Sequence, residues 1–278
     1  MSAAPSTVSE GSTWSIESRI DFLLRLRREI GPRFGSEDLC ILLYSLVKRE
    51  RPAVVVELGT GYGVTATWIA AAMRENGSGR LLTFDNGSAF MQPRTQEFLS
   101  KLTGSLAELA TAAQISSFAQ YLEIMFRRAD VDAHVTFAQR EFDVRNLSWL
   151  EQMLAGSRID MLFSDFDHAP QTIATLLGQC LPLMHHTSSV FIDSASTHLP
   201  AFLTLERLVE QLNRRQLPKC IADQLSDSQR MSVKELMAGS TFKLMHLLEN
   251  VRRKQNSTAW LRIEPVDLVP PPVTDFLH

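Results

Sequence analysis

The fold is decided by the stretch Val54-Val55-Val56-Glu57-Leu58-Gly59-Thr60-Gly61-Tyr62-Gly63-Val64. Its first half begins with a short run of apolar, β-branched residues, which predicts a strand buried on both faces of a parallel sheet. Glycines then recur at every second position, as a tight turn requires where no Cβ atom can be accommodated. A helical pattern follows over residues 64–74, and backbone N–H groups at such a helix start can hold a polar ligand. The stretch therefore predicts a strand, a glycine turn and a helix that bind a ligand together.

Strand and helix patterns alternate along the rest of the chain. Helices are expected before this stretch at residues 15–30 and 36–48, and strands after it at residues 81–85, 135–138, 159–164 and 189–192. Further helices are expected at residues 147–154, 171–183 and 201–215, and final strands at 219–222 and 258–263, whereas 242–251 fits a helix or a strand. This alternation predicts an α/β fold with a Rossmann-like, doubly wound, mostly parallel seven-stranded sheet.

A helical insertion is expected after the second strand. About fifty residues separate the second and third strands, and one crossover helix would need about half that number. Apolar residues at helical spacing predict two or more helices in the inserted segment, at about residues 87–133. The insertion can be extra core, a dimer contact or a lid over a substrate pocket. We therefore divide the chain into a tail and helix at 1–35 and one ligand-binding domain at 36–278 that contains the insertion.

The composition is that of a globular protein of 278 residues, with 45% hydrophobic and 21% charged residues. Its formal net charge of −3 lacks the basic excess of nucleic-acid-binding proteins, so we expect a small-molecule partner and no nucleic acid. Cys40, Cys180 and Cys220 form no CxxC pair and are expected in the core or at its boundary. Residues 1–12 lack a secretory signal pattern and no apolar run could cross a bilayer, which predicts a cytoplasmic protein without a membrane partner.

Two familiar nucleotide-binding patterns match the glycine turn less well than a third. The dinucleotide pattern GxGxxG, counted from Gly59, places Val64 where the third small residue is required. A P-loop needs Gly-Lys-Ser/Thr after its last glycine, but Gly63 is followed by Val64-Thr65. The pattern that fits is Glu-x-Gly-x-Gly-x-Gly. With it, the sequence resembles the class I S-adenosylmethionine (SAM)-dependent methyltransferases over about residues 36–194.

This resemblance implies a set of residues that hold SAM. An acid at the end of the second strand binds the ribose hydroxyls in that family, and Asp85, followed by Asn86, occupies this position. A second acid, after the third strand, contacts the adenine amino group, and Glu141 and Asp143 are both candidates for that role. The first motif of the family corresponds to Glu57, Gly59, Thr60, Gly61 and Gly63.

The fourth predicted strand ends in residues that are suited to methyl transfer. The segment Asp165-Phe166-Asp167-His168 resembles the Asp-x-Asp-His segment of small-molecule, catechol-type O-methyltransferases, in which the first acid faces methyl donor and acceptor. Asp165 is therefore expected to contact SAM and to orient the acceptor. His168, with an ordinary pKa of about 6.5, can act as a general base for a hydroxyl or an amine. Alternatively, His168 caps the next helix or binds Asp167.

A magnesium site is a further implication of the catechol-type resemblance. In those enzymes acids at the ends of the fourth and fifth strands bind the metal together with an Asn. Asp165 and Asp193 match the two acids, but Ser194 stands in place of the Asn. Oxygen ligands of this kind suit magnesium. Asp165 and Asp193 are thus the candidate ligands, and the Ser194 replacement argues against the metal.

These patterns predict an enzyme that transfers the methyl group of SAM to oxygen or nitrogen of a small molecule, such as a secondary metabolite. The N-terminal helices and the insertion would shape the acceptor pocket, and a homodimer is compatible with this reading. One alternative keeps the donor but changes the reaction, to aminopropyl transfer or cyclisation. Another is a catalytically silent SAM-binding regulatory protein. A nicotinamide oxidoreductase is opposed by Val64.

Overall fold

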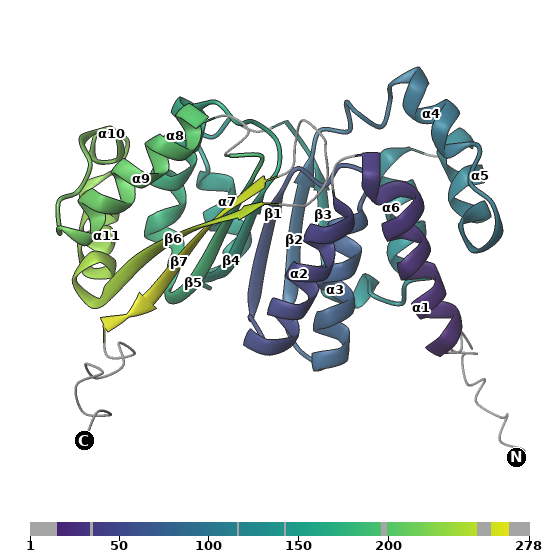
Figure 1. The fold of residues 1–278 in the computed structure, drawn as a ribbon, viewed down its shortest axis with the longest axis horizontal. Helices are drawn as coiled ribbons and strands as arrows, with labels where there is room; N and C mark the ends of the chain where they lie inside the picture. The colour runs from purple at the N-terminus through teal and green to yellow at the C-terminus, as the bar shows by residue number, and fades with distance from the viewer. Residues whose placement is uncertain are drawn as a thin grey trace, which may run out of the picture.

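The protein folds around a central seven-stranded sheet with the strand order β3-β2-β1-β4-β5-β7-β6 (Figure 1). The computed structural model describes residues 16–33, 36–115, 117–141, 143–195, 199–248 and 257–266, so the predicted tail at 1–12 lies outside the described residues. Strands β1 to β5 pair in parallel, and β7 pairs antiparallel with β5 and β6. The strands are β1 (Val54–Leu58), β2 (Arg80–Asp85), β3 (Val135–Gln139), β4 (Ile159–Ser164), β5 (Met184–Asp193), β6 (Ser240–Leu248) and β7 (Ser257–Pro265). The predicted Rossmann-like, mostly parallel sheet is confirmed.

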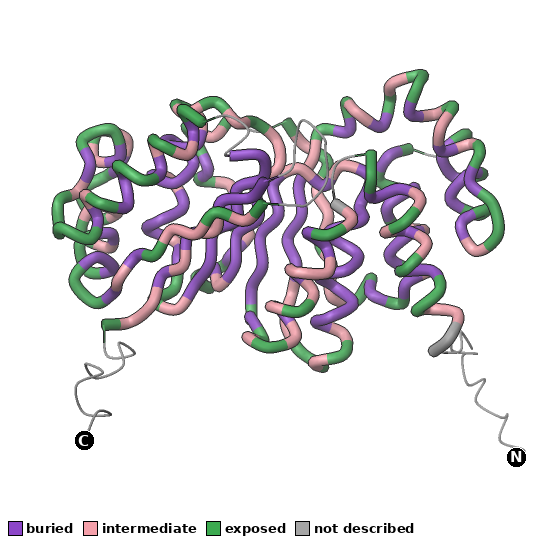
Figure 2. Tube along the Cα trace, in the orientation of Figure 1, coloured by how far each residue is buried: buried purple, intermediate pink, exposed green. Residues whose placement is uncertain are grey.

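Helices cover both faces of this sheet, as Figure 1 shows. One face carries α1 (Ile16–Arg25), α2 (Ser36–Glu50) and α3 (Val64–Asn76), and the other carries α7 (Ser148–Leu154), α8 (Pro170–Cys180) and α9 (Leu199–Asn213). Side chains of β1 alternate between the two cores, with Val55 in the first and Val54 and Val56 in the second. Every β1 residue is buried because β2 and β4 flank it and helices cover both faces. Figure 2 shows these buried strands between helices with exposed outer surfaces.

The predicted insertion contains three α-helices between β2 and β3: α4 (Pro93–Leu99), α5 (Ala107–Ile115) and α6 (Phe118–Arg128). They share a hydrophobic core with α1, α2 and α3, to which Leu106 and Tyr121 contribute fully buried side chains. Ser105 ties the insertion to α1, since its Oγ donates to Asp21 Oδ2 at 2.9 Å and accepts from Arg25 Nη1 at 3.3 Å. We call α1, its continuation to Arg33 and α4 to α6 the cap.

The C-terminal part departs from the sequence predictions. Residues 219–222 form helix α10 (Lys219–Ala222), not a strand, because they follow Pro218 and Lys219 pairs with Asp223 one helical turn later. The helix α11 (Asp227–Gly239) was not predicted, although Ser226 and Gln229 form a capping box at its start, which is a sequence signal. The ambiguous segment from residue 242 belongs to strand β6, which pairs with β7 along its whole length.

The cysteines and the helix lengths complete the description. Cys40 and Cys180 are buried as predicted, but Cys220 is exposed because α10 turns only Ile221 into the core. None of the described helices combines the length and the apolar character needed to cross a membrane.

Candidate functional site

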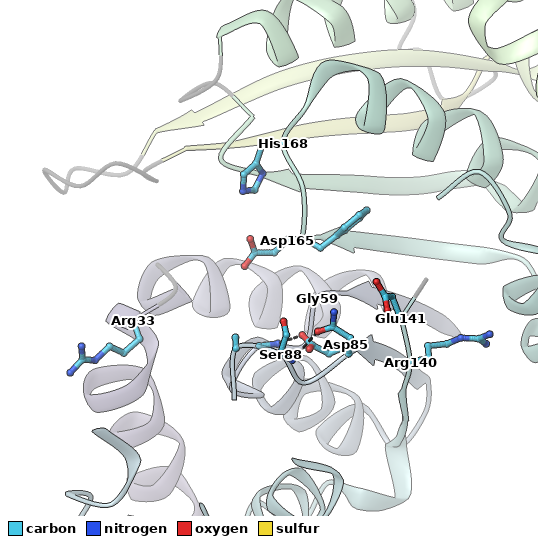
Figure 3. Close-up of a pocket in the computed structure, with 12 residues that line it drawn as sticks. Arg33, Gly59, Asp85, Ser88, Arg140, Glu141, Asp165 and His168 are labelled. Carbon is cyan, nitrogen blue, oxygen red and sulfur yellow. Dashed lines mark hydrogen bonds between the residues drawn. The ribbon is translucent and has the colours of Figure 1, made fainter. Parts of the chain in front are cut away.

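A cavity of about 500 Å³ lies beyond the carboxyl ends of β1, β2, β3 and β4, where open α/β sheets bind their ligands (Figure 3). The sheet side of its wall carries most of the residues singled out from the sequence. The lining residues are Arg33, Gly59, Gly61, Asp85, Asn86, Ser88, Ala89, Arg140, Glu141, Asp165, Phe166 and His168.

Gly59 holds the ends of three strands together. Its backbone N–H donates to Phe84 O at 2.9 Å, so the turn after β1 is attached to β2. Its φ of +99° lies in the region that favours glycine, and a Cβ at this position would lie 2.2 Å from the backbone O of Asp165. The glycine is therefore required for the close approach of β1 and β4, which brings Asp165 to the edge of the cavity.

Asp85 is fixed at the cavity by the turns on either side of it. Its Oδ2 accepts from Gly61 N at 2.9 Å, and its Oδ1 accepts from Gly87 N at 2.6 Å. Each carboxylate oxygen has a further lone pair that can accept from a ligand hydroxyl. Asn86 lines the cavity beside it and accepts from Ser88 N at 2.9 Å through Oδ1. The geometry suits a ligand with neighbouring hydroxyl groups.

Glu57 and Thr60 stabilise the turn from below and do not line this cavity. Glu57 is fully buried, and its Oε2 accepts from the hydroxyl of Thr83, whose oxygen lies 2.6 Å from Thr60 Oγ1. Burial raises the pKa of the Glu57 carboxyl to about 8, although the Thr83 hydrogen bond acts in the opposite direction. Their predicted role in cofactor binding would thus be exerted through the position of the turn.

Gly63 also lies away from the cavity lining. It precedes α3 with a φ of +80°, and a Cβ there would lie 2.6 Å from Leu122 Cδ2 and 3.0 Å from Met125 Sδ, both on α6. The third glycine of the motif therefore admits the insertion against the start of α3. Its place in the sequence motif suggested cofactor contact, whereas the structure assigns it to helix packing.

The two acids that follow β3 have different surroundings. Glu141 lines the cavity, whereas Asp143 lies outside it and forms an exposed ion pair with Arg145, with Oδ2 2.7 Å from Nη2. This pairing lowers the pKa of Asp143. The structure thus favours Glu141 of the two candidates for a ligand amino group.

Asp165 and His168 line the same cavity, from the loop that follows β4. Figure 3 shows the His168 ring directed toward the Asp165 carboxyl. Burial raises the pKa of Asp165 well above its ordinary value, and the nearby Asp193 adds to the rise. Asp167 faces elsewhere, since its carboxylate accepts from Ala169 N at 3.1 Å and Thr172 Oγ1 at 2.6 Å at the start of α8. Asp167 therefore binds groups at the start of α8, and His168 lines the cavity.

The arrangement around Asp193 does not fit a catechol-type magnesium site. Asp193 is buried, and its oxygens accept from Ser194 Oγ at 2.8 Å and Thr258 Oγ1 at 3.2 Å. Hydroxyl donors thus engage both oxygens of the carboxylate that would face a metal. Across the described part of the chain, no three His, Cys, Asp or Glu side chains are grouped to hold a metal ion. No catalytic step is derived through magnesium.

Five cavity residues were not among the site residues predicted from the sequence: Arg33, Ser88, Ala89, Arg140 and Phe166. Arg140 and Phe166 are neighbours of predicted site residues and could have been found by their position after a strand. Arg33 belongs to the N-terminal segment, and only the packing of that segment against the sheet brings it to the cavity.

Solved structures that are partly similar to this chain include methyltransferases. The O-methyltransferase TomG from Streptomyces achromogenes, in complex with SAM, is 16% identical, with 91% of this chain and 92% of that chain covered and a TM-score of 0.48. The O-methyltransferase from Bacillus cereus in complex with SAH (S-adenosylhomocysteine) is 12% identical, with 92% of this chain and 94% of that chain covered and a TM-score of 0.45. The SAH-bound methyltransferase PaMTH1 from Podospora anserina is 12% identical, with 90% of this chain and 89% of that chain covered and a TM-score of 0.46. At these TM-scores the similarity is weak, and no conclusion about this chain rests on it.

The family assignment rests on the sequence of the sheet region. A search by sequence against curated proteins gives no match. A family model described as a methyltransferase domain, however, matches residues 56–195, from β1 to the end of β5. This region is half of the chain and includes the glycine turn, Asp85, Asp165 and His168. The chain therefore belongs to the methyltransferase domain family and is a class I SAM-dependent methyltransferase.

Proposed function

We propose that the protein methylates a hydroxyl oxygen, or an amine nitrogen, of a small-molecule acceptor. The observation that carries the proposal is that one cavity is lined both by the glycine turn with Asp85 and by the pair Asp165 and His168. The volume of about 500 Å³ suits small molecules. Three further predictions rest on the sequence: a secondary metabolite as the acceptor, a cytoplasmic location and a homodimer.

The cavity residues fit SAM by their chemistry. Asp85 offers acceptor lone pairs for ribose hydroxyls, and Glu141 offers them for an adenine amino group. Asp85, Glu141 and Asp165 together make a cavity wall that favours a cationic ligand. When bound, SAM would supply an electrophilic methyl group on its sulfonium.

His168 and Asp165 would serve the acceptor. Methyl transfer is an in-line displacement, so the protein must align the nucleophile and accept its proton. His168 takes the proton from a hydroxyl in this scheme as the new O–CH₃ bond forms and the S–CH₃ bond breaks. Burial raises the pKa of Asp193, while the charge of His168 acts in the opposite direction, so the two side chains lie close enough to interact and a protonated imidazole would have Asp193 nearby. Asp165 orients the acceptor at the strand end.

Binding and transfer can be tested separately. Isothermal titration should give binding of SAM and of S-adenosylhomocysteine (SAH), and mass spectrometry should detect a methylated product among phenols, catechols and amines. His168→Gln should lower kcat by about 10²- to 10⁴-fold while SAH affinity is retained. His134→Gln is the control, because His134 contacts Gly79 O and lies outside the cavity. Full activity of His168→Gln would contradict the base role, and SAM binding without any product would favour a silent binding protein.

A further inference from the structure

The described residues that line the cavity include one wall of carboxylates and two arginines. Among the described residues that line it, Arg33 and Arg140 carry permanent positive charge. Figure 3 shows them at opposite ends, with Asp85 and Asp165 between them. A ligand that is cationic in the middle and anionic at one end would match this distribution. The question is which arginine is available to such an anion.

Arg140 is stacked on an aromatic ring as Arg33 is, but its guanidinium is partly buried and lies beside an acid. Its guanidinium carbon lies 4.2 Å from the centre of the Trp149 ring, and its Nε is buried. Trp149 in turn packs edge-on against Phe84 of β2. Arg140 also lies next to Glu141, which is a carboxylate facing the same end of the cavity. These contacts make it a wall residue beside an acid.

Arg33 is held in place, and among the described residues it has no anionic partner. Its guanidinium carbon lies 3.9 Å from the centre of the Phe98 ring, on α4 of the cap. Within the part of the chain that the structure describes, no carboxylate lies within 4.0 Å of it. Stacking on an aromatic ring leaves the edge N–H groups of a guanidinium free to donate in a planar fork. That fork matches a carboxylate.

The segment that carries Arg33 is anchored against the glycine turn. Ile30 is buried, and a Cβ on Gly31 would lie 3.3 Å from the Glu37 backbone, so the chain turns tightly before α2. Ile30 and Gly31 line a small pocket of about 10 Å³ together with residues 59–62 of the glycine turn. Arg33 therefore belongs to the same site as the turn.

We propose that Arg33, stacked on Phe98, is a carboxylate-binding residue of the cavity. The inference rests on the proposed function, since it assigns the anionic end of a ligand in the same cavity. Two ligands carry such a group: the methionine part of the methyl donor, or an acidic acceptor. The chemistry of recognition is the same for both, and the sources are separated by experiment.

The donor arm compares two ligands that differ in one group. SAH and its analogue that lacks only the carboxylate, 5′-deoxy-5′-(3-aminopropylthio)adenosine, are titrated into wild type and Arg33→Met. If the donor carboxylate is the group bound, Arg33→Met lowers the affinity for SAH by about tenfold to a hundredfold and leaves the affinity for the analogue unchanged. The SAH affinity of Arg33→Lys should fall between those of wild type and Arg33→Met, because lysine keeps the charge but lacks the planar pair of donors.

The acceptor arm uses benzoate as the carboxylate probe and benzamide as its neutral counterpart, titrated into protein saturated with SAH. If an acidic acceptor is the source, wild type binds benzoate and Arg33→Met loses that binding, while SAH affinity is the same in both proteins. Phe98→Leu keeps Arg33 but removes the ring on which it stacks. It should lower the affinity for the same ligand as Arg33→Met does, by a smaller factor.

Matched controls separate this assignment from folding and from the proposed function. Arg28→Met removes an arginine of the same segment that is 71% exposed, and it should change no affinity. If Arg33→Met leaves SAH, its analogue and benzoate binding as in wild type, the assignment is overturned. Failure of wild type to bind SAH would instead overturn the proposed function, and the inference would fall with it.

Discussion

The cavity has a sheet wall, formed by residues at the strand ends, and a cap wall, formed by Arg33, and the two differ in how their residues are held. On the sheet wall, Gly59, Asp85 and Asp165 follow neighbouring strands, and backbone hydrogen bonds place each of them. On the cap wall, Arg33 is placed by stacking on Phe98 and by a segment packed on buried apolar residues. The sheet wall carries groups suited to the methyl donor and the proton. The cap wall carries Arg33, the residue proposed to bind a ligand carboxylate.

The comparison also concerns stability. The cap is not a separate layer laid over the sheet, because α6 packs directly against Gly63 at the start of α3. Its apolar residues belong to the same core as α2 and α3. We therefore expect the cap to unfold with the sheet, and changes on either wall to be distinguishable by whether they alter stability or ligand affinity.

The largest effect is expected from Gly59→Ala on the sheet wall. The new Cβ would lie 2.2 Å from Asp165 O, so β1 and β4 must separate, at an expected cost of at least about 4 kcal/mol in the free energy of unfolding. Gly77→Ala is the control, since its φ of +67° brings strain of about 1–2 kcal/mol but no atom lies within 4 Å. Urea unfolding measures both, and equal losses would show that steric contact at the strand ends is unimportant.

The next effect is expected from Leu122→Ala in the cap. Leu122 is fully buried, so its truncation should lower the free energy of unfolding by about 2–5 kcal/mol in a single transition. Leu203→Ala on α9, at a residue that is 43% exposed, should change it by less than about 0.5 kcal/mol. An earlier, separate transition in Leu122→Ala, with sheet stability unchanged, would show that the cap is an independent unit.

Asp85→Asn tests whether the sheet wall binds the donor. We expect SAH affinity to fall by about tenfold to a hundredfold, because one acceptor oxygen is replaced by an amide. Asp160→Asn is a matched control at the opposite end of the sheet, where Asp160 Oδ2 accepts from Ala53 N at 2.8 Å and Val54 N at 2.9 Å. It should lower stability and leave SAH affinity unchanged. Calorimetric titration of SAH would refute the assignment if both variants bind alike.

A pH dependence of stability is expected to originate below the glycine turn. Burial raises the pKa of Glu57 from 4.5 to about 8, so the folded protein keeps a proton that the unfolded chain has released. Stability should therefore fall as pH rises from about 5 to 8, by about 2–4 kcal/mol from this group. Glu57→Gln should flatten the profile, whereas the exposed Glu235→Gln should not. Identical profiles of wild type and Glu57→Gln in urea unfolding would contradict the assignment.

The sheet side of the site was largely predictable, because its signals are local. A run of apolar residues followed by glycines specifies a buried strand and a turn, and a parallel sheet places the ends of neighbouring strands together. Asp85, Asp165 and His168 could thus be named before the structure was known, and Glu141 as one of two candidates with Asp143. Residues 219–222 were misjudged because four residues hold too little pattern to separate a strand from a helical turn.

Two distinctions within the motif needed three dimensions. Gly63 looks equivalent to Gly59 in the sequence, but its neighbours Leu122 and Met125 come from a helix far along the chain. Glu141 and Asp143 are two positions apart, and only the fold shows that Asp143 is paired with Arg145 outside the cavity. The local sequence pattern specifies which residue types lie at a strand end, but not which side chains each of them contacts.

The sequence by itself determined the fold class, the methyl-donor motif and the acids at the strand ends, because hydrophobic periodicity and glycine spacing act over a few residues. The tertiary structure decided the composition of the cap wall. Arg33 reaches the cavity because Leu26 and Ile30 are buried against the core, and its support Phe98 comes from the insertion. Such a contact between distant segments follows from how apolar surfaces pack, and no periodicity within either segment encodes it.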